Sequence, residues 1–86
     1  MSEVVEWHEL KRLMLNHAQI ISGKGPKVVV LAERPDLLAA ATLELEFRLR
    51  RLAKNLSLAA KSVLFEELAA DNPGLDFSGT RRLFGL

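Results

Sequence analysis

The residues that could do chemistry begin with two histidines, His8 and His17, in the first quarter of the chain. His8 and Glu9 begin the zinc-binding helix pattern H-E-x-x-H, but Arg12 stands where the second histidine should be. On a helix, His17 would lie on roughly the opposite side from His8. The sequence contains no cysteine, which excludes thiolate chemistry and zinc–sulfur sites. We therefore expect no catalytic residue, no metal site and no cofactor, and the chain is not expected to be an enzyme.

The segment SGKGPK, residues 22–27, combines glycines and lysines as phosphate-binding loops do. The full pattern G-x-x-x-x-G-K-[ST] would need glycine where Ala18 stands and serine or threonine where Gly25 stands. We interpret the segment as a helix stop and turn. The alternative is that its backbone amides, with Lys24 and Lys27, hold an anion.

Basic residues gather in residues 48–61, which contain no acid, although the net charge of the whole chain is only +1. Acidic residues follow in residues 66–76. One interpretation is a solvated helix surface whose charged ends attract an antiparallel partner; the other is a phosphate-contacting stripe of a small dimeric nucleic-acid-binding protein. The candidate phosphate-binding residues are Arg48, Arg50, Arg51, Lys54 and Lys61.

The C-terminal segment RRLFGL is the most specific short feature. It resembles two docking peptides: the basic R-x-L-F segment that enters the cyclin groove, and the C-terminal peptide of bacterial sliding-clamp partners. The leading glutamine of the second peptide is absent. The resemblance implies a tail that binds a protein partner, whereas the alternative is that its apolar side chains cover the core. The candidate tail residues are Arg81, Arg82, Leu83, Phe84 and Leu86.

These residues must be positioned by helices, and the first is predicted over residues 2–22. Trp7, Leu10, Met14 and Ile21 recur at spacings of three and four, which predicts one apolar face. The segment VVVLAERPD that follows fits either a strand or a helical turn, because three valines favour extended structure. Pro35 ends that segment and can begin the next helix.

The octet LELEFRLR, residues 43–50, alternates apolar and charged residues as a half-buried strand does. Residues 37–54, however, contain no Gly, Pro, Asn, Asp or Ser and consist mostly of strong helix formers. We therefore predict a helix, from about residue 36 to residue 70, either unbroken or interrupted near Asn55–Ser57. The alternative is a small α+β fold with strands at 28–31 and 43–49.

As a helix, the octet has apolar side chains on two opposite sides, so that one neighbour cannot cover both. One side is expected to face the first helix through Leu45, Leu49, Leu52, Leu56, Ala59 and Val63. Leu43 and Phe47 lie on the other side, which predicts a homo-oligomer. The candidate self-association residues are Leu43, Leu45, Phe47, Leu49, Leu52 and Leu56.

The predicted architecture is all-α: a helical hairpin or three-helix arrangement with a long central helix, completed by self-association. Residues 1–74 would form a single helical domain and residues 75–86 an apolar and basic tail. With 49% hydrophobic residues and no apolar run long enough to span a bilayer, we expect a soluble cytoplasmic protein without a membrane partner. The predicted function is a non-catalytic protein–protein interaction module, such as an adaptor, assembly or regulatory subunit; the alternative is the nucleic-acid-binding protein described above.

Overall fold

Helices account for all the regular structure in the computed structural model, which describes the backbone of residues 2–86 and the side chains from Trp7 onward. The elements are α1 (Ser2–Ile21), α2 (Pro26–Val30), α3 (Pro35–Ala53), α4 (Leu58–Asp71) and α5 (Ser78–Leu83). No strand occurs within residues 2–86. The all-α prediction is confirmed, and the alternative with strands at 28–31 and 43–49 is wrong.

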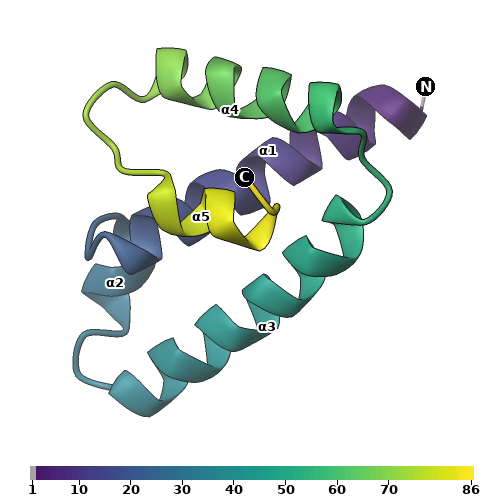
Figure 1. Ribbon diagram of the computed structural model, residues 1–86. Helices are drawn as coiled ribbons and strands as arrows, with labels where there is room; N and C mark the ends of the chain where they lie inside the picture. The colour runs from purple at the N-terminus through teal and green to yellow at the C-terminus, as the bar shows by residue number, and fades with distance from the viewer. Residues whose placement is uncertain (1) are drawn as a thin grey trace.

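The first helix, α1, is the centre of the fold and contacts each of the other four helices. In Figure 1, α4 and α3 diverge on either side of α1, and the short yellow α5 lies between them. The core residues with the lowest exposure come from α1, α3, α4 and the C-terminal segment: Met14, Ala18, Leu49, Leu64, Phe65 and Phe84.

The turn after α1 forms as the sequence predicts. Gly23 ends the helix with a φ of 70°, and Gly25, with a φ of 95°, precedes Pro26 at the first position of α2. Both φ values lie in the left-handed region that favours glycine. The valine run is helical here, but α2 buries none of its residues, and Val29 and Val30 are each 77% exposed.

The octet lies inside α3, so its period-two pattern divides a helix into two apolar sides. Leu45 and Leu49 are buried against the rest of the chain, at 6% and 0% exposure. Pro35 occupies the first turn of the helix and Asp36 adds an acidic residue there, as both residue types favour.

The predicted segment 36–70 is two helices. The Ser57 hydroxyl caps α4 by accepting a hydrogen bond from the Ala60 amide at 3.1 Å. Because α4 begins with a new direction, the apolar series from α3 does not continue: Ala59 and Val63 are exposed, and Leu64, Phe65 and Leu68 are buried instead.

Two more of the residues that were predicted to pack between the first helix and the central helix are exposed instead. Leu52 is 40% exposed because it lies near the end of α3, and Ile21 is 43% exposed at the end of α1. Both were expected between the first helix and the central helix.

The C-terminal segment, predicted only as an apolar and basic tail, contains the helix α5. The Asp76 carboxylate accepts a hydrogen bond from the Ser78 amide at 2.9 Å as this helix begins. Phe77, Thr80 and Phe84 recur at helical spacing and are all buried, at 7%, 0% and 1% exposure. The helix was missed because it is short and because a threonine, a polar residue, occupies the middle of its buried face.

Within the described residues, none of the helices combines the length and apolar character that crossing a lipid bilayer requires.

Candidate interaction surface

The outward side of α3 carries the most prominent exposed apolar pair of that helix. Leu43 and Phe47 are 66% and 62% exposed, while Leu45 and Leu49 on the other side are buried. A helix turns about 100° per residue, so Leu43 and Phe47 point away from the core and lie one turn apart. The prediction of two opposite apolar sides is thus confirmed.

One flank of this surface is basic. The Arg51 guanidinium carbon lies 5.9 Å from the centre of the Phe47 ring, a cation–π arrangement. Arg48, Arg51, Leu52 and Asn55 line an open hollow of about 290 Å³ at the same end of α3. A partner that covers Phe47 therefore also meets arginine.

The other flank contains a shallow apolar groove of about 480 Å³. Its lining comes from the end of α1 and the first half of α3: Ile20, Pro35, Leu38, Ala39, Thr42, Leu43 and Glu46. Glu46 is the only charged residue in this lining. The groove is thus suited to an apolar side chain with a cation nearby.

The candidate self-association residues divide between core and surface. Leu45 and Leu49 are buried in their own chain, and Leu56 is half-buried against the core. Leu43 and Phe47 are the members of the set with the greatest exposure, followed by Leu52. We use the name α3 outer surface for six exposed residues on the side of the helix away from Leu45 and Leu49: Ala39, Ala40, Leu43, Phe47, Arg50 and Arg51.

The candidate phosphate-binding residues do not form one stripe, because the α3–α4 turn separates them. Arg48, Arg50 and Arg51 lie on α3 and Lys54 follows it, all exposed. Lys61 lies on α4 and is half-buried, and its ammonium donates a hydrogen bond to the Phe84 carbonyl at 3.0 Å. Lys61 thus holds the C-terminal segment in place.

The C-terminal segment contributes to the core as well as to the surface. Phe84 packs edge-to-face on Phe65, with ring centres 5.3 Å apart, and Arg81 lies 5.3 Å from the centre of the same Phe65 ring. Arg81 and Arg82 are exposed, and Leu83 and Leu86 are half-buried. A partner of the folded chain would meet the arginines and the leucine edges, because the Phe84 ring is covered.

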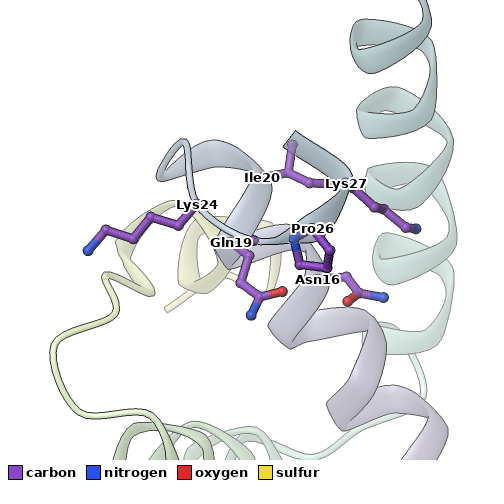
Figure 2. Close-up of a pocket in the computed structure, with 7 residues that line it drawn as sticks. Asn16, Gln19, Ile20, Lys24, Pro26 and Lys27 are labelled. Carbon is purple, nitrogen blue, oxygen red and sulfur yellow. The ribbon is translucent and has the colours of Figure 1, made fainter. Parts of the chain in front are cut away.

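The lysines of the glycine-rich turn do not converge on one point. Figure 2 shows Lys24 and Lys27 extending toward opposite sides of the turn. The hollow between Gln19, Pro26 and their neighbours has a volume of about 10 Å³, which is the size of one water molecule. This geometry agrees with the interpretation as a helix stop and turn.

A polar chain that is buried at His17 and Thr80 and half-buried at Glu46 links three helices and was not predicted from the sequence. His17 on α1 lies with Nδ1 2.8 Å from the Thr80 hydroxyl of α5 and Nε2 3.1 Å from Oε2 of Glu46 on α3. A carboxylate oxygen only accepts, so Nε2–H donates to Glu46. In the neutral ring, Nδ1 then accepts from the Thr80 hydroxyl.

The order hydroxyl, imidazole, carboxylate is the one that nucleophilic catalysis uses, but here it has no access to a substrate. Thr80 is 0% exposed and His17 is 1% exposed, whereas a nucleophile must reach the reacting atom. The arrangement therefore holds α1, α3 and α5 together. His17 falls on the apolar face of the first helix, between Met14 and Ile20, and this was the one sequence signal that could have indicated its burial.

Ion pairs on the surface connect α1 to α4. The Lys11 ammonium donates a hydrogen bond to Glu67 at 3.0 Å, and this bond lowers the pKa of the Glu67 carboxyl below its ordinary value. On α1, a hydrogen bond from Arg12 likewise lowers the pKa of Glu9. Neither pair lies at the α3 outer surface.

Comparisons with known protein families, with curated proteins and with solved structures found no match for this chain.

Proposed function

We propose that this chain is a non-catalytic helical protein–protein interaction module that self-associates and presents the α3 outer surface and the C-terminal segment to a protein partner. The observation that carries the proposal is the exposure of Leu43 and Phe47, at 66% and 62%, directly opposite the core side of α3. Covering the exposed part of each side chain would stabilise a complex by about 1–2 kcal/mol. Two such residues one turn apart supply the apolar centre that an interface requires.

One arrangement among the described residues has the order hydroxyl, imidazole, carboxylate that nucleophilic catalysis uses, and it is inaccessible. The one hydroxyl–imidazole pair, Thr80 and His17, is buried. The hollows beside α3 are open and shallow, whereas active sites exclude water from the reacting groups.

The C-terminal segment supplies the second contact of the module. Arg81 and Arg82 are exposed beside the half-buried Leu83 and Leu86, an arrangement of charge around a small apolar edge. Phe84 contributes indirectly, because its burial holds the segment against α4.

The test is a sedimentation and light-scattering series of the wild type up to high micromolar concentration, alongside Phe47→Glu. The wild type should self-associate, and the variant should shift toward monomer because a charge replaces the exposed ring. Val29→Glu is the matched control, since Val29 is 77% exposed on α2, outside the proposed surface. A wild type that stays monomeric, or a control that dissociates as readily as Phe47→Glu, would contradict the proposal.

A nucleic-acid-binding function is the second candidate, favoured by one observation. Arg48, Arg50 and Arg51 are exposed, and in the part of the chain that the structure describes they make no ion pair. Phosphate contacts make affinity fall steeply with added salt. Binding of an oligonucleotide that weakens with salt and is lost in Arg50→Glu would favour this candidate over the first.

A further inference from the structure

The charges of α3 are separated along its length. Its acidic residues, Asp36, Glu44 and Glu46, all precede its basic residues, Arg48, Arg50 and Arg51. Leu43 and Phe47 lie around the point where the sign changes. The helix therefore carries its acidic residues from the first turn to the middle and its basic residues beyond the middle, with the apolar pair near its centre.

The residues proposed for the interface lie on one side of α3. At about 100° per residue, Ala40, Leu43, Phe47 and Arg50 all fall on the side away from Leu45 and Leu49. All four are exposed. The apolar pair also lies near the middle of α3, so a second helix centred on it would overlap nearly the whole length of the first.

The charge order decides which way a second copy would run. In a parallel pair, the acidic part of each helix would face the acidic part of the other, and like charges in contact are unfavourable. In an antiparallel pair centred on Leu43 and Phe47, Asp36 lies opposite Lys54, and Arg50 of one copy lies one helical turn from Asp36 and from Glu44 of the other, although Glu44 also lies opposite Glu46. The helix dipoles also oppose one another favourably. The α3 outer surface is thus complementary to itself only in the antiparallel direction.

We propose that the occupant of the α3 outer surface is the same surface of a second copy of this chain, antiparallel and related by a two-fold axis. Leu43 lies opposite Phe47 of the second copy, and the symmetry makes this contact twice. The Phe47 ring of the second copy enters the apolar groove beside Leu43, which Ile20, Leu38 and Ala39 also line. This inference rests on the proposed function, because it requires the chain to self-associate.

The register follows from the same pairing. With Leu43 opposite Phe47, Ala40 lies opposite Arg50 of the second copy. The small Ala40 side chain leaves space for that arginine to extend toward Asp36 and Glu44, each one turn from Ala40. Asp36 also pairs with Arg34 of its own chain at 3.2 Å. The edge of the proposed interface is then charged and salt-sensitive, while its centre is apolar.

Disulfide trapping tests the direction and the register, and the chain suits it because it contains no native cysteine. Two variants, Ala40→Cys and Arg50→Cys, are prepared separately and then mixed under mild oxidation. The mixture should give a crosslinked heterodimer, because the two positions face one another within the range that a disulfide bridges. Each variant alone should crosslink far less, since two copies of the same position lie about 15 Å apart along the axis at 1.5 Å per residue. Val29→Cys is the control for random collision.

Each outcome has one meaning. Preferential Ala40–Arg50 crosslinking, lost when Phe47→Glu is added to both chains, would support the proposal, and Phe47→Glu should weaken dimerisation by about tenfold or more. Strong crosslinking of Ala40→Cys to itself would show that the two helices run parallel. If sedimentation shows a dimer but no specific crosslink forms, the dimer uses another surface of the chain. Both overturn this inference and leave the interaction module standing, whereas a monomeric wild type overturns both.

Discussion

Replacing Thr80 by valine should weaken the fold, because it removes one buried hydroxyl and changes the side-chain volume little. The hydroxyl is fully buried and bonds Nδ1 of His17 at 2.8 Å, where His17 itself is 1% exposed. In the variant, Nδ1 stays buried without a partner, and water does not reach it. The change therefore removes a hydrogen bond and leaves a desolvated nitrogen behind.

The expected cost follows from those two effects. Leaving one buried polar group unpaired costs about 1–3 kcal/mol of the free energy of unfolding. For a domain of this size, each kcal/mol lowers the melting temperature by about 4–8 °C, so a 2 kcal/mol loss lowers it by about 8–16 °C. Urea unfolding followed by circular dichroism measures the free energy, and calorimetry measures the melting temperature.

The other threonine of the chain provides a matched control. Thr42 donates its hydroxyl to the Leu38 carbonyl within α3 and is half-buried, so Thr42→Val should change the stability much less. The double variant His17→Leu with Thr80→Val removes both polar groups and should lose less stability than the two single changes added together. If Thr80→Val unfolds at the same urea concentration as the wild type, the polar chain does not hold the helices together.

Substitutions at three further sites test the fold by equilibrium unfolding. Phe84→Ala should cost about 3–5 kcal/mol because its ring is 1% exposed and packs on Phe65, and an unchanged unfolding midpoint would show that the C-terminal segment is not part of the core. Ser57→Ala should cost about 1 kcal/mol through loss of the α4 cap, whereas Ser57→Asp should restore it. The hydrogen bond from Lys11 lowers the pKa of Glu67, so this contact stabilises the fold above pH 4.5, and the stabilisation is lost as the pH falls through the folded-state pKa. Lys11→Met should therefore make the free energy of unfolding less dependent on pH in the acid range. A pH profile identical to that of the wild type would refute this expectation.

Much of the secondary structure follows from signals within a few residues. Gly23 stops α1, Pro35 starts α3 and Ser57 caps α4, and each acts on the backbone beside it. The alternation in residues 43–50 could be assigned to a helix because no turn residue interrupts residues 37–54. The two-sided exposure of α3 then followed from helical geometry alone.

The candidate surface was predictable only in part. Leu43 and Phe47 could be placed opposite Leu45, because these residues share one unbroken helix. The positions of Leu52 and Val63 could not, since one lies at the end of α3 and the other on a helix that starts with a new direction. A periodic pattern loses its meaning where the helix that carries it ends.

The sequence by itself determined the helical class, the end of α1, the start of α3, the end of α4 and the apolar pair on the outer side of α3, because helix propensity, caps and periodicity are local properties. The tertiary structure alone decided that Phe84 lies in the core and that His17 meets Glu46 and Thr80. Those contacts join three helices that are distant along the chain. Their geometry depends on how the helices cross, which no short stretch of sequence encodes.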